Sequence, residues 1–249
     1  MSQASISVVV PQPVPLPKNF KLHSNWFRTY GPKVKRLVDS YSELEWRFLL
    51  TLEADPNVRV YCEQFPRVDE PVNGKKLNCV FDFWIRYQDG SEELIEIKPV
   101  SKLTRNALGE LAPPRWDDIN EWCRLHQCKC RFVTDENLKQ HEKLTDNWAQ
   151  LLPHIQRAVT RNNDGLLARI VGAVVSSEVA VINDLGKMFP AEDTEELQDL
   201  LLLALHQRRV AMDLQSAEAA AVNFCTKVIR GLSRNTPLGA SRRRGHSVQ

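Results

Sequence analysis

The chain has 249 residues, of which 43% are hydrophobic and 26% are charged. This composition is typical of a globular protein with a core and excludes an intrinsically disordered chain. The longest aliphatic stretches, Ile170 to Val175 and Leu200 to Leu205, fall far short of the roughly 18 apolar residues of a membrane span, so we expect no membrane association. The N-terminal stretch lacks the basic-then-apolar order of a secretory signal, which predicts a cytoplasmic protein with six reduced cysteines.

The net charge of +2 hides an uneven distribution along the chain. Residues 1–38 and residues 222–249 each hold six Lys or Arg and no acid, and subtracting these twelve from the 33 basic residues leaves 21, against 31 acids, in between. Basic ends on an acidic body indicate that the ends contact a polyanion such as nucleic acid. Two solvated tails are an equally good interpretation of the charge alone.

The first half of the chain predicts alternating helices and strands. Apolar residues at helical spacing predict one helix from Ser42, with Ser42 as N-cap and Glu45 completing a capping box, and a second over Trp116 to His126. The predicted strands are Val58 to Tyr61, Leu77 to Tyr87, Glu93 to Val100 and Cys130 to Thr134. The first three form an antiparallel meander with a turn at residues 88–91, and the order as a whole predicts an α/β fold with a mixed sheet.

The second half is rich in Leu and Ala and predicts helices near residues 144–159, 164–176, 178–188 and 194–209, followed by a short strand over Arg209 to Leu214. Short helices before a small β element indicate a winged helix, with a plain helical bundle as the alternative. The acidic cluster between Glu192 and Asp199 suits a basic protein surface better than DNA, so we expect this half to dock a protein.

Three candidate catalytic residues lie in the segment from Asp82 to Lys98. Alternation along the strand places Glu96 and Lys98 on one face, and a tight turn at Asp89-Gly90 brings Asp82 beside Glu96. Two carboxylates and an ammonium in an apolar sheet are costly unless a cation neutralises the acids, so the pattern predicts a Mg²⁺ site for phosphodiester hydrolysis. The alternative is a surface ion pair between Lys98 and a glutamate.

Five segments occur together in an order that resembles the TnsA family, the endonuclease subunit of heteromeric bacterial transposases. They are Ser42-Glu43-Leu44-Glu45-Trp46-Arg47-Phe48-Leu49-Leu50, Asp55-Pro56-Asn57-Val58, Glu63-Gln64-Phe65-Pro66, Phe81-Asp82-Phe83 and Glu96-Ile97-Lys98. The resemblance covers roughly residues 28–135 and implies a restriction-endonuclease-like mixed sheet flanked by helices, followed by a winged-helix-like domain. The chain departs from the family in having Phe81 where a proline is usual and Phe65 between Gln64 and Pro66.

The resemblance implies roles for particular residues. Glu45, Asp82, Glu96 and Lys98 match the family's catalytic residues, and Glu43 competes with Glu45 for the helical acid. The expected metal ligands are Glu45, Asp82, Glu96 and Ile97, with Mn²⁺ able to replace Mg²⁺. Gln64 is an accessory candidate that orients a phosphate or water, although a glutamine capping a strand end is the simpler interpretation.

The implied organisation is a basic arm over residues 1–27, a nuclease domain over 28–140, a docking domain over 141–235 and a basic tail over 236–249. We expect the enzyme to nick the 5′ ends of a transposon in the bacterial cytoplasm, at the nucleoid, beside a DDE-type transposase (TnsB-like). An AAA+ ATPase regulator (TnsC-like) would dock on the C-terminal domain. The expected contacts with double-stranded DNA are Lys33, Lys35, Arg36, Arg242, Arg243 and Arg244. A restriction or repair nuclease of the same fold and a non-catalytic adaptor are the alternatives.

A second group of potential metal ligands lies between Cys123 and Cys130. Cys123, His126, Cys128 and Cys130 are four potential zinc ligands within eight residues. Convergence of all four is not required by their spacing, and buried cysteines usually serve as small hydrophobic residues, so we expect a packing role and keep zinc as the alternative.

Overall fold

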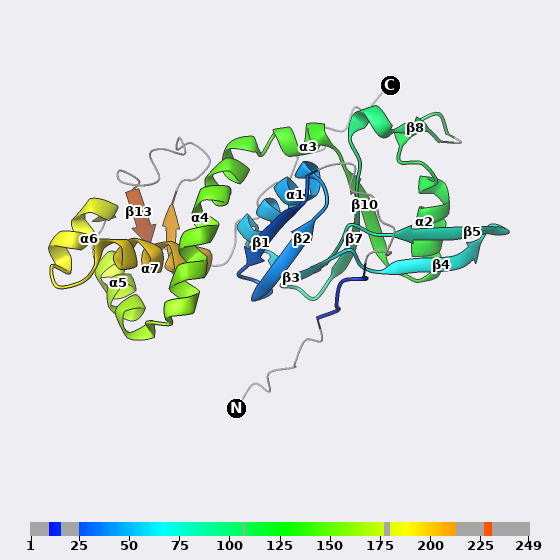
Figure 1. Ribbon diagram of the computed structural model, residues 1–249. Coiled ribbons are helices and arrows are strands. Elements are labelled where there is room, and N and C mark those ends of the chain that lie inside the picture. The colour runs from blue at the N-terminus through cyan, green and yellow to red at the C-terminus, as the bar shows by residue number, and fades with distance from the viewer. Residues whose placement is uncertain (1–9, 16–24, 107, 177–179, 213–226, 231–249) are drawn as a thin grey trace, which may run out of the picture.

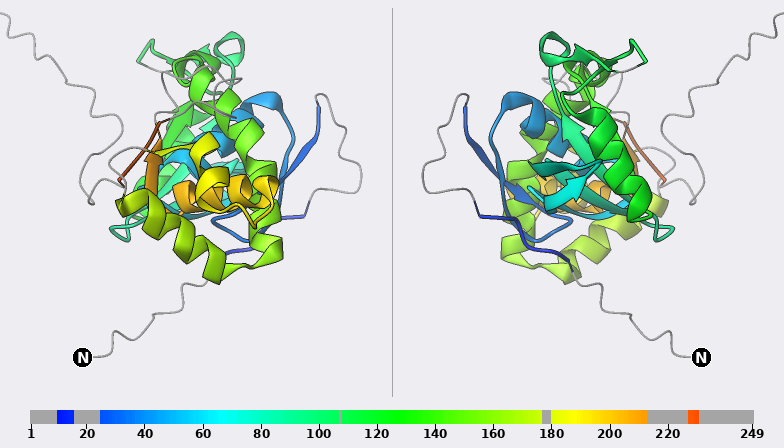
Figure 2. Two further views of the ribbon diagram at one scale, coloured as in Figure 1. Left: turned by 90° about the vertical axis from the view of Figure 1, so that its left-hand side faces the viewer. Right: turned by 90° about the vertical axis from the view of Figure 1, so that its right-hand side faces the viewer.

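The computed structural model describes residues 10–15, 25–106, 108–176, 180–212 and 227–230. A four-stranded mixed sheet with helices on both faces occupies one part of the molecule, and a mainly helical region containing α5, α6 and α7 forms the other end (Figures 1 and 2). The strand order is β10-β7-β6-β3, in which β10 is parallel to β7 and the other pairs are antiparallel. The predicted α/β class with a mixed sheet is therefore confirmed.

The strands of this sheet are β3 (Val58–Glu63), β6 (Phe83–Tyr87), β7 (Glu92–Ile97) and β10 (Lys129–Val133). The predicted turn at residues 88–91 joins β6 to β7, and the Tyr87 and Ser91 backbones hydrogen bond across it. The expected strand over Leu77 to Tyr87 is wrong in one respect. It is broken at Asp82 into β5 (Lys75–Val80) and β6, because β5 leaves the sheet to pair with β4 (Arg67–Val72) in a separate hairpin.

One face of the sheet packs against helix α1 (Glu43–Ala54). The predicted N-cap is confirmed, since the Ser42 side chain accepts the Glu45 backbone N–H at 3.1 Å. Phe48 and Leu49 of the helix join Ile95 of β7 in a buried cluster. Leu44, Phe48 and Leu52 of this cluster recur every four residues along one face of α1, which is why the sequence pattern found this helix.

The other face of the sheet packs against helix α2 (Trp116–Leu125), which matches the helix predicted over Trp116 to His126. Trp116, Ile119 and Trp122 lie with Leu94 of β7 in a second buried cluster, which the β4–β5 hairpin also joins. Leu94 and Ile95 therefore face opposite cores, as the alternation of side chains along a strand requires.

Several short elements were not predicted from the sequence. A hairpin of β1 (Phe27–Gly31) and β2 (Arg36–Ser40) packs near α1, so the region after the expected arm begins with β structure. A smaller hairpin of β8 (Thr104–Arg105) and β9 (Leu111–Ala112) follows the 3-10 turn η1 (Val100–Lys102). Helix α3 (Asp135–Lys139) follows β10, where Thr134 and Asn137 form a capping box.

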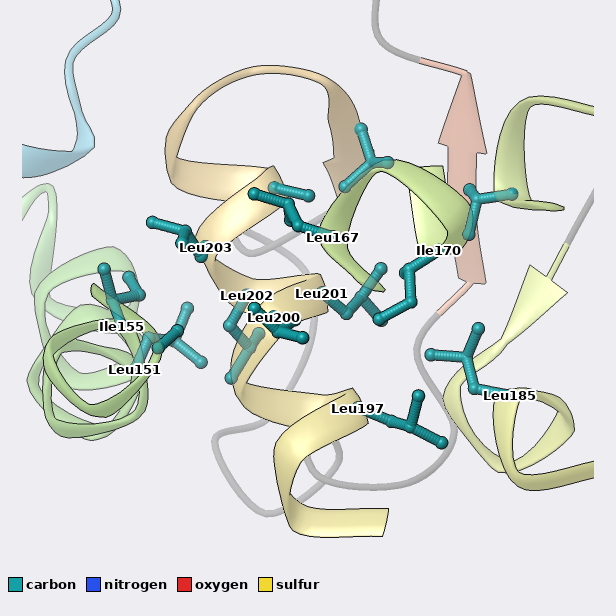
Figure 3. Close-up of a cluster of buried hydrophobic side chains, with 14 of the residues drawn as sticks. Leu151, Ile155, Leu167, Ile170, Leu185, Leu197, Leu200, Leu201, Leu202 and Leu203 are labelled. Carbon is teal, nitrogen blue, oxygen red and sulfur yellow. The ribbon is translucent and has the colours of Figure 1, made fainter. Parts of the chain in front are cut away.

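The C-terminal region contains the four predicted helices. They are α4 (Glu142–Arg161), α5 (Asp164–Ser176), α6 (Ile182–Met188) and α7 (Thr194–His206). Leucines of α7 lie between α4, α5 and α6, and Leu200 and Leu201 are buried at the centre (Figure 3). A three-stranded sheet of β11 (Ala180–Val181), β13 (Lys227–Arg230) and β12 (Val210–Met212) completes the region, and β12 matches the predicted short strand.

The acidic cluster at the start of α7 is largely paired within the chain. Asp199 is fully buried and binds His154, Arg157 and Arg161 of α4, at 2.6 to 3.1 Å. Glu192 pairs with Arg169, and Glu195 and Glu196 contact Arg157 and Asn163. These acids hold α7 against α4 and α5, so the negative surface that suggested protein docking is mostly neutralised.

The two regions share a continuous core. Leu50 of α1 is 1% exposed and lies in the same cluster as Trp148 and Leu151 of α4. Beside it, the buried carboxylate of Glu53 accepts a hydrogen bond from Tyr61 at 2.6 Å and contacts His206 of α7 at 2.8 Å. None of the helices in the described part of the chain is long and apolar enough to cross a membrane.

Candidate functional site

Asp82 lies at the break between β5 and β6, where the chain enters the sheet. Its backbone N–H donates to Ile95 O at 2.9 Å, and its carboxylate Oδ2 accepts the Ile97 N–H at 2.6 Å. Phe83 is opposite Ile95 in the β6–β7 register, so continuing this register by one residue places Asp82 opposite Glu96. The predicted approach of these two carboxylates is confirmed.

Glu96 and Lys98 follow one another on the same face at the end of β7. Lys98 Nζ lies 2.8 Å from Glu96 Oε1, and the Glu96 side chain is only 12% exposed while that of Lys98 is 37% exposed. The ammonium is therefore held at the mouth of the site. Ile97 between them is buried in the α1 core, so only its backbone reaches the site.

Glu45 approaches the same place from the first turn of α1. One carboxylate oxygen accepts the Tyr41 backbone N–H and the other the Ser42 hydroxyl, both at 2.9 Å. The capping box is thus modified, because Glu45 reaches back to the Tyr41 N–H. Gln64 Nε2 also donates to Glu45, at 3.4 Å.

Glu43 points elsewhere. Its carboxylate pairs with Arg47 one turn along the helix at 3.0 Å and is 59% exposed. The charge of Glu45, by contrast, raises the pKa of Asp82. Of the two competing helical acids, the geometry brings Glu45 into the site.

We call Glu45, Asp82, Glu96 and Lys98 the carboxylate–lysine cluster. Burial, followed by the charges of Glu96 and Glu45, raises the pKa of Asp82 well above its ordinary value of 3.8. Burial also raises the pKa of Glu45, with Glu96 adding to the effect. For Lys98, burial works to lower the pKa, but Glu96, Asp82 and Glu45 outweigh it and the pKa is raised. Three acids thus repel one another around a single cation.

The donor set suits a hard divalent cation. Carboxylate oxygens are the ligands that Mg²⁺ prefers, and a cation would relieve the repulsion that raises the pKa of Asp82. Asp82 and Glu96 each have one oxygen without a hydrogen bond to the described residues. No group of three His, Cys, Asp or Glu side chains in the described residues already has the spacing of a metal site. Both oxygens of Glu45 are already engaged by its own cap.

Gln64 is held by the backbone in an unusual conformation next to the cluster. Its φ of 48° lies in the left-handed region, which costs a residue other than glycine on the order of 1 kcal/mol. Its N–H donates to Asp82 O at 2.8 Å, and its carbonyl accepts the Val14 N–H at 3.0 Å. These backbone bonds join Gln64 to both Asp82 and the N-terminal segment, and its predicted accessory role stays a prediction.

Two neighbours of the cluster were not found from the sequence. The thiol of Cys79 has its pKa raised to about 11 by burial and by the charge of Glu96, so this cysteine adjoins the site as an unreactive thiol. Val14 contacts Gln64 from a segment far along the chain. Neither carries a sequence signal, because both contacts depend on tertiary packing.

Three of the predicted DNA-contacting residues, Lys33, Lys35 and Arg36, lie in the described part of the chain. Lys33 donates to the Leu52 and Asp55 carbonyls at the far end of α1, and Lys35 is exposed nearby. Arg36 forms a bidentate pair with the buried carboxylate of Glu63, at 2.5 and 2.6 Å. Arg36 is thus already neutralised, which argues against its predicted role. Arg242, Arg243 and Arg244 lie outside the described residues.

The potential zinc ligands divide into two groups. Cys123, Cys128 and Cys130 are mutually close enough to perturb one another's thiol pKa, and all three adjoin the α2 core. His126 instead stacks on Trp122 with ring centroids 4.3 Å apart, and its Nδ1 contacts the Trp122 carbonyl. The arrangement favours packing, the interpretation expected of buried cysteines.

No protein-family model matches the chain, and no curated protein matches it in sequence. The resemblance to the TnsA family therefore stays a prediction from the sequence motifs.

Proposed function

We propose that the chain is a metal-dependent endonuclease that hydrolyses phosphodiester bonds in DNA. The observation that carries the proposal is the convergence of Glu45, Asp82 and Glu96 around Lys98 at one end of the sheet, with the pKa values of Glu45 and Asp82 raised. A structural ion pair requires one acid for one lysine. Three partly buried acids around one cation destabilise the fold, and such sites are typically kept for binding or catalysis.

The proposed roles follow from geometry. Asp82 and Glu96 would hold a Mg²⁺ ion, which supplies charge stabilisation at the phosphate and lowers the pKa of water. Lys98, at the mouth of the site, would orient the attacking water and stabilise the negative charge that develops on the phosphate. Glu45 and Gln64 would position these groups from α1 and the end of β3, since both are fixed by backbone hydrogen bonds.

We further propose that the nuclease is TnsA-like, with a restriction-endonuclease-like sheet and a winged-helix-like C-terminal domain, and nicks the 5′ ends of a transposon. The motif order and the α1–β3–β6–β7 arrangement support this. In this setting a DDE-type transposase cuts the 3′ ends and an AAA+ regulator binds the C-terminal region. Because the acids of α7 are paired internally, regulator binding would depend on surfaces other than the cluster from Glu192 to Asp199.

The test is nicking of supercoiled plasmid bearing transposon ends, with Mg²⁺ and the companion transposase and regulator. Asp82→Ala and Lys98→Ala should each reduce the nicking rate at least about 100-fold, the scale of losing one preorganised charged group. Mn²⁺ should support cleavage, whereas Ca²⁺ should bind without turnover.

A matched pair on α1 controls for nonspecific effects. Glu45→Gln should reduce nicking, and Glu43→Gln should leave it unchanged, because Glu43 pairs with Arg47 at the surface. Full cleavage by either Asp82→Ala or Lys98→Ala would refute the active-site assignment. Equal loss in the Glu43 and Glu45 variants would refute the assignment of the helical acid.

A further inference from the structure

A cleft of about 320 Å³ lies at the junction of the two regions, away from the carboxylate–lysine cluster. It is lined by the turn between β1 and β2, the end of α1, the start of β3 and the end of α7. Glu45 and Ala54 are nine residues apart on α1, which corresponds to about 14 Å along the helix axis. The cleft is therefore at the opposite end of α1 from the proposed active site.

The cleft has a strong excess of positive charge. Four cationic side chains line it, namely Lys33, Lys35, Arg59 and Arg208. Within the described residues, Lys35, Arg59 and Arg208 form no ion pair, although the charge of Asp55 acts on Arg208 and Arg208 and Lys33 repel one another. We call these four residues the basic cleft.

The acids near the cleft offset only part of this positive charge, through the action of Glu53 and Asp55 on Lys33. Glu53 lines the wall, but its two carboxylate oxygens are already engaged by Tyr61 and His206. Lys33 donates to two carbonyls at the end of α1, which leaves one of its three N–H groups for another acceptor. Burial lowers the pKa of Lys33 to about 8, a cost that a bound anion would offset.

We propose that the basic cleft binds phosphate groups. Unpaired Lys and Arg side chains converging on a concave site provide the charge-assisted hydrogen bonds that phosphate oxygens accept. The volume is at the lower end of the range for small-ligand sites and accommodates a diphosphate group. The phosphate comes either from a free diphosphate-bearing ligand or from a DNA backbone, and both present the same chemistry. The site does not depend on the proposed nuclease activity.

The test uses the full chain with EDTA present, so that no divalent metal contributes. Binding of inorganic pyrophosphate is measured by calorimetry, and binding of a 30-base-pair duplex by fluorescence anisotropy. The cleft variant combines Lys35→Asn, Arg59→Gln and Arg208→Asn. Asparagine is chosen because Lys35 and Arg208 have φ values of 55° and 62°, a conformation that asparagine tolerates.

The matched control variant combines Lys75→Gln, Lys139→Gln and Lys143→Gln, which removes the same charge from exposed positions outside the cleft. Unchanged thermal unfolding of both variants establishes that they fold. A single Lys35→Arg variant keeps the cleft charge and should bind like the wild type.

Two results support the proposal. Pyrophosphate binding that falls at least tenfold in the cleft variant, and not in the control, identifies a free phosphate ligand. The second result is that the wild type does not bind pyrophosphate, and that duplex affinity falls at least tenfold more in the cleft variant than in the control. This result identifies the DNA backbone as the source of the phosphate. The proposal is overturned if the cleft and control variants bind each probe equally well. It is also overturned if the cleft variant binds pyrophosphate as tightly as the wild type does.

Discussion

Asp82→Asn tests whether the charge of Asp82 destabilises the fold while being required for activity. Asparagine keeps a carbonyl oxygen that can accept the Ile97 N–H and removes only the negative charge. We expect the metal-free variant to be more stable than the wild type at pH 7, and to be inactive. An ordinary structural aspartate would show the opposite change in stability.

The expected gain in stability of Asp82→Asn follows from the direction in which the pKa of Asp82 moves on folding. Burial and the charges of Glu96 and Glu45 raise this pKa, so the folded protein holds the proton more tightly than the unfolded chain. The folded state is therefore favoured most below pH 3.8 and loses this stability as the pH rises through the higher, folded-state pKa. Each tenfold gain in proton affinity on folding corresponds to about 1.4 kcal/mol of lost stability once both states are ionised. For a chain of this size that loss lowers Tm by about 3–5 °C.

The assay is thermal unfolding in EDTA between pH 4 and pH 8. The gain in Tm of the variant should grow with pH and vanish near pH 4. Mg²⁺ at ten times its Kd should stabilise the wild type by about 1.4 kcal/mol and leave the variant unchanged. A variant that is less stable than the wild type at pH 7 would refute the reasoning.

Asp39→Asn is the matched control, because it makes the same chemical change where the opposite sign is expected. The hydrogen bond from Arg28 lowers the pKa of Asp39. Burial opposes this shift, and a hydrogen bond from Trp26 and the charge of Arg28 add to it. This stability is present above the unfolded pKa and is lost as the pH falls through the folded one. Asp39→Asn should therefore lower Tm at pH 7 and have less effect in acid.

Three further predictions concern the junction of the two regions and the tail. Leu50→Ala should reduce the free energy of unfolding by about 2–5 kcal/mol in a denaturant titration, because Leu50 is 1% exposed in the core shared with α4. His206→Ala should cost about 3 kcal/mol in the same titration, since it leaves one oxygen of the buried Glu53 carboxylate without its hydrogen-bond partner; a loss below about 1 kcal/mol would contradict that role. Removing residues 236–249 should weaken DNA binding and flatten its salt dependence in anisotropy titrations, and an unchanged slope would show a tail that does not contact DNA.

The sequence by itself determined the features that depend on neighbouring residues. Ser42 caps α1, because a cap is a contact over three residues. The turn after Tyr87 and the alternation along β7 were sufficient to place Asp82 opposite Glu96, since a hairpin fixes its own register. The C-terminal helices followed from leucine spacing, because a helix that buries one stripe must repeat at 3.6 residues.

Only the tertiary structure decided which charged side chains are paired within the chain and which can take part in a site. Glu43 and Glu45 compete for the helical acid in the sequence, but Glu43 pairs with Arg47 at the surface and Glu45 faces the strands. The acids of α7 resembled a docking surface, yet Asp199 is buried against arginines of α4. Charge is visible in a sequence, whereas its partner depends on contacts between residues tens of positions apart, which local patterns do not encode.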